Sequence, residues 1–286
     1  MANTVVWNKH DYVVKMRARI NAPTSWAEVL KVQYSDVRTI QNAALTTEPT
    51  VTSETRGTAY TYSDFTLTQD TLTISLYRAI PVFVDEADRH QQTYFNQMDI
   101  ADFQGKKISE FLEAQMLAQH ASWTNFGASD LTNTGDDDTA TITVSASNVD
   151  DLIRAIKRKL YANNGVERAI EKGIFIIWRA ADYELLEAFV QANGFSEADV
   201  ALKSGIPVGM RYMGVDHFLS TNHTANHLFA GIKGEGELGI LRSTFGVVKF
   251  IEDPNNVSGL GIVSRLDYDW LFPTINNEFF MDINVA

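Results

Sequence analysis

A glycine motif is the first feature of this sequence with residues of a type and spacing suited to chemistry. Gly234, Gly236 and Gly239 match the G-x-G-x-x-G pattern of a dinucleotide-binding turn. Such a site also needs a helix that begins at the glycines, because the helix N-terminus holds the pyrophosphate. The residues that follow, ILRSTFGVVKF, have the β-branched and aromatic character of a strand. The sequence therefore predicts no cofactor at this turn.

Three histidines form the second candidate, a metal site. His217, His223 and His227 lie close together, and an H-x3-H pair on one helical face is able to bind zinc. The surrounding STNHTANH is typical of a loop instead, and no further ligand is evident. We therefore predict no metal site here, although an enzyme that uses these three histidines with a metal stays open as an alternative.

Other motifs of catalysis or metal binding are absent from the sequence. The acidic run Asp136–Asp138 lacks the alternating oxygen ligands and the distal carboxylate of a calcium loop. There is no G-x-S-x-G elbow, no phosphate-binding loop and no H-E-x-x-H pattern. We predict no catalytic residue, and we expect that the protein is not an enzyme.

The composition limits the class of protein further. A chain of 286 residues with 45% hydrophobic content is able to bury a core in one or two domains. The absence of cysteine excludes disulfides and thiolate sites, and a cytosolic origin is the simplest reading. The net charge of −12 argues against a broad basic surface that grips nucleic acid. No apolar run is long enough to predict a membrane span, and the N-terminus does not resemble a signal peptide.

The element around which the chain is organised is a long helix, predicted over residues 84–121. Its apolar residues recur at alternating steps of four and three: Tyr94, Met98, Ala101, Gly105, Ile108, Leu112 and Met116. Further apolar residues widen this face: Phe95, Phe103, Phe111 and Leu117. Asp85, Glu86 and Asp88 place negative charge on the predicted first turn. A helix of this length would span roughly 55 Å, and we expect it to bend at Gly105.

The segments before the helix are predicted as an arm and a hairpin. Residues 51–83 alternate with period two, so we predict two long strands joined by a turn at Gln69–Asp70. This polar hairpin lies either on its own sheet or on another surface. In residues 1–50 a capping pattern at Ser25 predicts a short helix flanked by extended arms. The large apolar residues there, Trp7, Tyr12 and Trp26, pack either on their own domain or on a neighbouring subunit.

The second half of the chain alternates between helical and strand patterns. We predict a helix over 149–161, a buried strand at IFIIW, a helix over 181–192 and a shorter helix from Ser196 to Gly205. Glycine-punctuated strands follow to the end of the chain. The predicted class is α+β.

This order of segments resembles the major capsid proteins of tailed bacteriophages, which have the Hong Kong ninety-seven type fold also used by encapsulins. The resemblance is carried by the passage from hairpin to helix, IPVFVDEADRHQ, and by the path KGIFIIWRAADYELL, SGIPVGMRYMGVDHFLSTN and HLFAGIKGEGELGIL. It implies an N-terminal arm (1–50) and an extended β-hairpin loop (51–83). It also implies a peripheral domain with the long spine helix (84–145 and 243–286) and an α/β axial domain (146–242).

The resemblance implies a structural role in a virion. The chain would assemble in the host cytoplasm, as hexamers and pentamers, into an icosahedral shell that encloses double-stranded DNA without sequence-specific binding. Its partners would be copies of itself, a scaffolding protein, a portal protein and in some systems a decoration protein, with no membrane. Candidate inter-subunit contacts are Trp7, Trp26, Arg56, Asp64, Asp70, Arg78, Asp85, Glu86, Asp88 and Arg89. The alternative within this fold is an encapsulin-type nanocompartment that holds cargo enzymes.

Two features bear on how such a shell would be held together. Some relatives join their subunits through an isopeptide bond that starts from a lysine of the extended loop, whereas residues 51–82 contain no lysine. We therefore expect a shell without this crosslink. A helix-rich charged extension is also absent, so we expect that the scaffold is a separate protein or that the scaffolding segment has already been removed.

Overall fold

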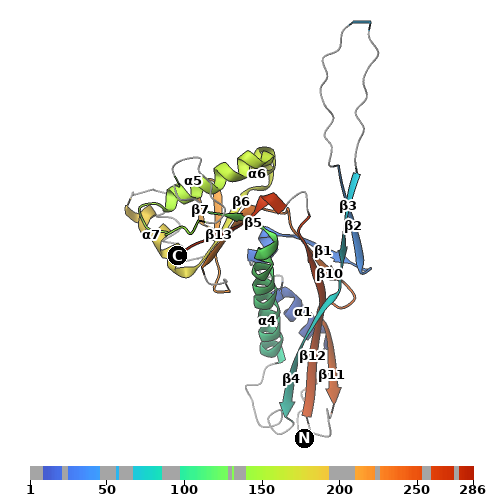
Figure 1. The fold of residues 1–286 in the computed structure, drawn as a ribbon. Coiled ribbons are helices and arrows are strands. Elements are labelled where there is room, and N and C mark those ends of the chain that lie inside the picture. Colours follow the sequence, from blue (N-terminus) through green and yellow to red (C-terminus); the bar gives the residue numbers. More distant parts are fainter. Residues whose placement is uncertain are drawn as a thin grey trace.

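The computed structural model describes residues 9–20, 25–45, 56–57, 67–85, 97–127, 131, 140–192, 210–222, 226–252, 259–273 and 277–286. Within them lie a five-stranded sheet, a six-stranded sheet and a separate two-stranded pair (Figure 1). The predicted α+β class is therefore confirmed. In this part of the chain, no helix combines the length and apolar character needed to cross a membrane.

Strand β12 (Gly259–Leu271) is the centre of the five-stranded sheet. β4 (Leu76–Asp85) pairs antiparallel with one of its edges, from Gly259 to Tyr268. β11 (Val247–Glu252) and β10 (Glu237–Leu241) pair with the other edge, one after the other. β1 (Lys31–Ser35) extends the sheet as a parallel neighbour of β10.

Three helices pack on this sheet and form one hydrophobic core with it. They are α1 (Lys9–Ile20), α2 (Ser25–Val29) and α4 (Gln97–Leu117). The predicted apolar face of α4 is buried at Ala101, Ile108, Leu112 and Met116, so its helical period is confirmed there. Tyr12 of α1 is fully buried, and its hydroxyl donates to Gln104 Oε1 at 2.6 Å.

The start of the predicted long helix is wrong. Val84 and Asp85 belong to β4, because Ile80, Val82 and Val84 alternate as a strand that pairs with β12. The described helix of 21 residues spans about 32 Å, well below the length expected from the sequence. The acidic residue of its first turn is Asp99 and not Asp85.

The extended hairpin is formed by strands other than those predicted. β2 (Thr39–Leu45) pairs antiparallel with β3 (Leu67–Thr73), and together these strands project away from the sheets (Figure 1). Gln69 and Asp70 lie inside β3, opposite Ala43 and Asn42, so the predicted turn there is wrong. β4 instead pairs within the five-stranded sheet, which is the alternative that the sequence left open for the hairpin predicted at residues 51–83. We call β2, β3 and the chain between them the extended hairpin.

The N-terminal segment also differs from the extended arm that was predicted around a short helix. The short helix is present as α2, whereas residues 9–20 form α1, another helix. Tyr12, Met16 and Ile20 recur every fourth residue and are fully buried, which is a helical signal that the sequence analysis missed.

The six-stranded sheet has the order β5-β13-β9-β6-β8-β7. Its strands are β5 (Thr124–Phe126), β6 (Ile174–Trp178), β7 (Met210–Tyr212), β8 (Val215–Leu219), β9 (His227–Ile232) and β13 (Phe280–Asn284). The predicted buried strand IFIIW is β6, and all five of its residues are buried. One face of β6 packs with α5 (Val149–Leu160) and α7 (Ala180–Ala192), and its Phe175 and Ile177 face the core around α4.

Short helical turns and isolated pairings complete the described chain. η1 (Ala118–Ser122) continues α4, whereas η2 (Tyr161–Gly165) and α6 (Val166–Lys172) continue α5. η4 (Asn277–Phe279) precedes β13. Ile142 forms a single parallel bridge with Val285. The helix predicted from Ser196 to Gly205 and the acidic run Asp136–Asp138 lie outside the described residues.

The two sheets meet at the turn between β9 and β10. The Gly234 amide donates to the Val29 carbonyl at 2.7 Å, which ties this turn to α2. Glu235 is buried and accepts from Arg168 at 2.9 Å and from Lys172 at 2.8 Å, which ties the same turn to α6. At this turn the chain therefore passes from the six-stranded sheet to the five-stranded sheet.

Gly105 allows α1 and α4 to approach closely. A Cβ built at this position would lie 2.7 Å from the Met16 carbonyl oxygen and 2.8 Å from Arg19 Cβ. Both contacts are shorter than packed carbon and oxygen atoms tolerate, so α1 would have to move. This packing is a physical reason for glycine here that is independent of helix bending.

We predict that Gly105→Ala lowers the free energy of unfolding by about 1–3 kcal/mol, the usual cost of overpacking. Helix propensity alone predicts the opposite sign, a gain of about 1 kcal/mol. Chemical denaturation of the purified chain measures the difference. Lys106→Ala is the control, since Lys106 is exposed and contributes only a surface ion pair with Glu110. A Gly105→Ala chain as stable as the native one would contradict the close approach.

Candidate functional site

The extended hairpin begins and ends at the five-stranded sheet. At its base the Ile74 amide donates to the Arg38 carbonyl at 2.7 Å, just beyond the last pair of the β2–β3 ladder, Thr39 with Thr73. Leu72 and Ile74 are 2% and 1% exposed, so the hairpin is anchored in its own core at this end. Gly239 of β10 makes room for the anchor, because a Cβ there would lie 2.6 Å from Leu72.

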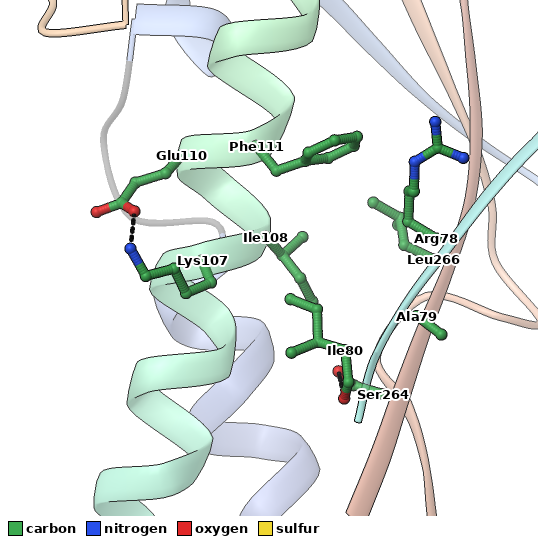
Figure 2. A pocket seen from close by; sticks show the side chains of 9 residues that line it. All are labelled: Arg78, Ala79, Ile80, Lys107, Ile108, Glu110, Phe111, Ser264 and Leu266. Carbon is green, nitrogen blue, oxygen red and sulfur yellow. Dashed lines mark hydrogen bonds and ion pairs between the residues drawn. The ribbon is translucent and has the colours of Figure 1, made fainter. Parts of the chain in front are cut away.

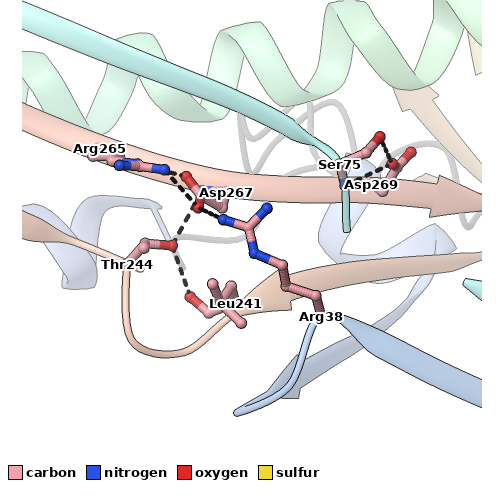
Figure 3. Close-up of polar contacts among 7 residues, drawn as sticks. All are labelled: Arg38, Ser75, Leu241, Thr244, Arg265, Asp267 and Asp269. Carbon is pink, nitrogen blue, oxygen red and sulfur yellow. Dashed lines mark hydrogen bonds and ion pairs between the residues drawn. The ribbon is translucent and has the colours of Figure 1, made fainter. Parts of the chain in front are cut away.

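A buried carboxylate of β12 holds the end of the hairpin at which β2 begins (Figure 3). Asp267 is 1% exposed, and Arg265 donates to both of its oxygens, at 2.7 Å and 2.9 Å. Arg38, which directly precedes β2, donates to Asp267 Oδ2 at 3.4 Å. The Thr244 hydroxyl accepts from the Asp267 amide at 3.3 Å and donates to the Leu241 carbonyl at 3.1 Å. Asp267 therefore connects the hairpin base to both β12 and the β10–β11 turn.

A second carboxylate of β12 holds the end of the hairpin at which β3 finishes. Ser75 follows β3, and both its amide and its hydroxyl donate to Asp269 Oδ2, at 3.1 Å and 2.7 Å (Figure 3). The direction in which the hairpin leaves the body is thus set from both sides by one strand. The sequence analysis did not single out Asp267 or Asp269, although two carboxylates in the strand-like LDYDW are an unusual signal.

A groove runs between α4 and the strands β4 and β12 (Figure 2). Its larger part has a volume of about 510 Å³ and continues along α4 into a second part of about 380 Å³. The two parts share Ile80 and Lys107. The floor of the larger part is apolar, and its side chains include Ile80, Ile108, Phe111 and Leu266. We call this surface the spine groove.

Charged side chains line the upper part of the spine groove. Arg78 of β4 places its guanidinium 5.6 Å from the centre of the Phe111 ring, a cation–π contact that leaves the side chain exposed. Lys107 donates to Glu110 Oε2 at 2.7 Å along the helix (Figure 2). The groove therefore offers an apolar floor with charges at its border, a composition common at protein–protein contacts.

One strongly exposed aromatic side chain lines the spine groove. Phe103 of α4 is 65% exposed and lines the second part of the groove, so the prediction that it widens the buried face is wrong. Tyr77 and Phe83 of β4 are also exposed, at 64% and 47%, but they alternate along the strand with Ile80 and Val82 and therefore lie on the other face of the sheet. The apolar floor of the groove together with the exposed ring of Phe103 indicates a surface that another protein covers.

A second exposed apolar surface lies on the helical continuation of α5. Val166 and Ile170 are one turn apart on α6 and are 44% and 78% exposed, and Tyr161 of η2 is 36% exposed. We call these three residues the α6 patch.

The predicted inter-subunit residues fall into three groups. The structure corrects the prediction that Trp26 is an inter-subunit contact. Its side chain is 1% exposed and its Nε1–H donates to Ser109 at 3.1 Å, so it packs in its own chain. Arg78 and Arg56 are exposed, whereas Asp70 of β3 and Asp85 of β4 are partly buried. The remaining candidates, Trp7, Asp64, Glu86, Asp88 and Arg89, lie outside the described residues.

Of the three histidines considered as a metal site, His217 and His227 lie in the described part of the chain, and they have different partners. His217 is fully buried in β8, where its Nδ1 accepts from Trp178 Nε1 at 2.8 Å. Its Nε2 is 3.2 Å from the Tyr212 carbonyl, to which it donates. Both ring nitrogens of His217 are thus occupied, and no lone pair is left for a metal. His227 lies on β9 with a different partner, and His223 lies outside the described residues.

The glycines of the G-x-G-x-x-G pattern have structural roles. Gly234 has a φ of +70° in the β9–β10 turn, which favours glycine. A Cβ on Gly236 would lie 2.7 Å from Phe272. β10 begins at Glu237, within the glycine pattern, and ends at Leu241. The strand character predicted for ILRSTFGVVKF is confirmed at its two ends, in β10 and β11, with a turn at residues 242–246 between them.

Burial lowers the pKa of His217 to about 4, so we predict a loss of stability in mild acid. The unfolded chain binds a proton near pH 6.5 while the folded chain does not, so this contribution is complete above pH 6.5 and is lost as pH falls toward 4. It amounts to roughly 3 kcal/mol at most. Unfolding free energies between pH 6.5 and 5 should therefore fall less steeply for His217→Gln than for the native chain. Equal slopes would contradict the assignment.

We predict that Asp267→Asn loosens the hairpin base, because it removes the charge that faces Arg265 and Arg38. The midpoint of thermal unfolding should fall by roughly 3–6 °C, and amide exchange in β2 and β3 should accelerate. Asp36→Asn is the matched control: its carboxylate is 73% exposed, and it pairs with Arg242 at 3.5 Å. Its midpoint should move by less than about 1 °C. Equal shifts in the two variants would contradict the anchoring role.

Comparisons with known proteins agree with this architecture. The chain is similar to a solved structure named "Capsid of Ralstonia phage GP4", with a TM-score of 0.63, 7% identity and coverage of 90% of this chain and 87% of that one. It is similar to a structure named "Mycobacterium phage Che8", with a TM-score of 0.62, 14% identity and coverage of 92% and 97%. It is also similar to a "virus-like particle from Pyrococcus furiosus", with a TM-score of 0.61, 10% identity and coverage of 97% and 100%. No family model and no curated protein matches the sequence. The chain therefore has the fold of phage capsid proteins, a fold shared by the Pyrococcus particle.

Proposed function

We propose that this chain is the major structural subunit of a closed shell that encloses the double-stranded DNA of a tailed phage. The observation that carries the proposal is the extended hairpin, a two-stranded pair that leaves the body of the protein (Figure 1). Two strands by themselves are marginally stable in water. Such an element is stabilised when it lies on another surface, and a second copy of the chain supplies one.

The surface that we propose for the hairpin is the spine groove of a neighbouring copy. Its floor is apolar, and Ile80 and Phe111 are partly exposed in the single chain. The sequence between β2 and β3 includes Tyr60, Tyr62 and Phe65, which are of a kind that fills such a groove. Each Å² of apolar surface that is buried stabilises a contact by about 25 cal/mol, so this contact would be favourable.

The two sheets would then have separate tasks in the shell. The five-stranded sheet with α4 would form the peripheral domain, which receives the neighbour's hairpin. The six-stranded sheet with α5, α6 and α7 would form the axial domain, whose α6 patch packs around the centres of hexamers and pentamers. Scaffolding and portal proteins would assist assembly in the host cytoplasm, as they do for the family that the sequence resembles.

The charge of the chain agrees with a container for DNA that does not read its sequence. A net charge of −12 disfavours tight binding to phosphates, so the nucleic acid would be enclosed and not gripped. Weak binding also suits a shell from which DNA must leave.

A second candidate function is a nanocompartment shell that encloses enzymes. The similarity to the Pyrococcus particle, which covers the whole of that chain, favours keeping this candidate. Particles that carry DNA together with portal and tail proteins support the phage shell, whereas particles that carry one bound enzyme support the compartment.

Electron microscopy of negatively stained protein tests the proposal. The chain is expressed alone and then with its neighbouring genes. Closed, uniform polyhedral particles under either condition are the expected result. Monomers or small oligomers under every condition would contradict the shell.

We predict that Phe103→Asp blocks assembly without unfolding the chain, because the exposed ring of Phe103 borders the spine groove. Val14→Asp is the matched control, since Val14 of α1 is 53% exposed and lies outside the groove and the α6 patch. The particle yield should fall at least about tenfold for Phe103→Asp. A loss of only about 1.4 kcal/mol of contact free energy weakens an association by this factor. Circular dichroism checks that both variants are folded. Equal yields would contradict the groove as a contact surface.

We predict that the assembled shell is held without covalent links between subunits. The hairpin region from residue 39 to 73 contains no lysine, and the chain contains no cysteine. Boiled particles should run as a single band of 32.0 kDa in SDS electrophoresis. A ladder of multiples of this mass would contradict the prediction.

A further inference from the structure

Two histidines and an aspartate meet where the long helix ends on the six-stranded sheet. His120 belongs to η1, directly after α4. His227 is the first residue of β9, and Asp282 is the central residue of β13. Asp282 lies opposite Phe229 in the β9–β13 ladder, so Asp282 and His227 share the face of the sheet that meets α4.

The three side chains converge on one another. Asp282 Oδ1 is 2.7 Å from His227 Nδ1, and Asp282 Oδ2 is 2.9 Å from His120 Nδ1. The two imidazole rings have centroids 4.6 Å apart. One potential ligand atom from each residue lies within 4.8 Å of the other two.

The surroundings suit a bound ion that keeps contact with solvent. The Asp282 side chain is 4% exposed, while both histidine side chains are 22% exposed. The ring of His227 is stacked parallel to that of Phe229, with centroids 6.4 Å apart, and Trp123 contacts the same phenylalanine edge-on at 5.2 Å. The cluster thus has apolar neighbours, while the partial exposure of both histidines leaves access for an ion and a water ligand.

We propose that His120, His227 and Asp282 bind a divalent transition-metal ion, with zinc as the best-suited member of the class. Two imidazoles and a carboxylate form a donor set that zinc uses when a water molecule completes a tetrahedron. This set differs from the three histidines that the sequence suggested, because only His227 is common to both. It also departs from the prediction that the chain has no metal site.

Binding requires a small rearrangement of hydrogen bonds. In the metal-free form each Nδ1–H donates to the carboxylate. To coordinate the ion, each neutral ring carries its proton on Nε2 and turns the Nδ1 lone pair inward, so that no net proton is released. Two ligands at about 2.0–2.1 Å from a tetrahedral ion are roughly 3.4 Å apart. The nitrogen–oxygen pairs must therefore separate by several tenths of an ångström, which side-chain rotation supplies.

The consequence of binding is mechanical. The ion would link the end of α4, which belongs to the five-stranded core, to β9 and β13 of the six-stranded sheet. It would thereby fix the angle between the two parts of the subunit. This inference rests on the geometry of one chain and does not depend on shell assembly.

Calorimetric titration with zinc chloride tests the site in the full chain after treatment with a chelator. We expect one zinc ion per chain, and we expect zinc to raise the midpoint of thermal unfolding. Cobalt(II) in place of zinc should give the visible absorption of a tetrahedral complex. The double variant His120→Ala/His227→Ala should lose binding.

Single variants separate ligands from neighbours. His227→Gln keeps a hydrogen-bond donor to Asp282 and removes the imidazole, and Asp282→Asn keeps one carbonyl acceptor. Each should weaken zinc binding by at least about tenfold, because even a residue that only orients a ligand contributes about 10- to 100-fold. His10→Ala, on the exposed face of α1, is the control and should bind as the native chain does. No binding by the native chain, or unchanged binding by the double variant, would overturn the proposal.

Discussion

The pairing of β12 is the interaction on which the rest of the structure depends. Its backbone holds β4 along one edge and β10 and β11 along the other. Each backbone hydrogen bond contributes only about 1 kcal/mol net, but three neighbouring strands share this one strand. Its Asp267 and Asp269 also anchor the two ends of the extended hairpin. One strand thereby positions the element that reaches outward and, through β4, one wall of the spine groove, which we propose as the surface for a neighbour's hairpin.

This arrangement has a physical consequence for assembly. A carboxylate that is 1% exposed and bound to Arg265 has little freedom, so the hairpin leaves the body in a defined direction. Leu266 of the groove floor lies next to Asp267 in β12. The same strand would therefore position both the hairpin of its own chain and the hairpin that the groove receives from a neighbouring copy. In the proposed shell, repeated contacts of this kind would hold the subunits together without covalent links.

Local periodicity made much of this fold predictable, and tertiary pairing explains the rest. The face of α4 from Ala101 to Met116 and the buried strand IFIIW follow directly from the spacing of apolar residues. The sequence could not show that Val84 would pair with Leu260, a pairing that makes the predicted start of the long helix part of a strand. Nor could it show that Gln69 would lie opposite Ala43 in a ladder instead of in a turn. The carboxylate anchors, the spine groove and the His120–His227–Asp282 cluster each join residues far apart in the chain. A local pattern marks only Asp267 and Asp269, as carboxylates in the strand-like LDYDW, and it does not show which residues they bind.

Cysteine crosslinking tests most directly whether the hairpin lies on a neighbouring copy. The natural chain has no cysteine, so one is introduced at Lys107 of the groove in one population. A second population carries one on the hairpin, at Arg56, Thr61 or Gln69. After the two are assembled together, a short bis-maleimide should link the two kinds of chain in particles but not in dissociated subunits. Particles that form without any such link at the three hairpin positions would contradict the account.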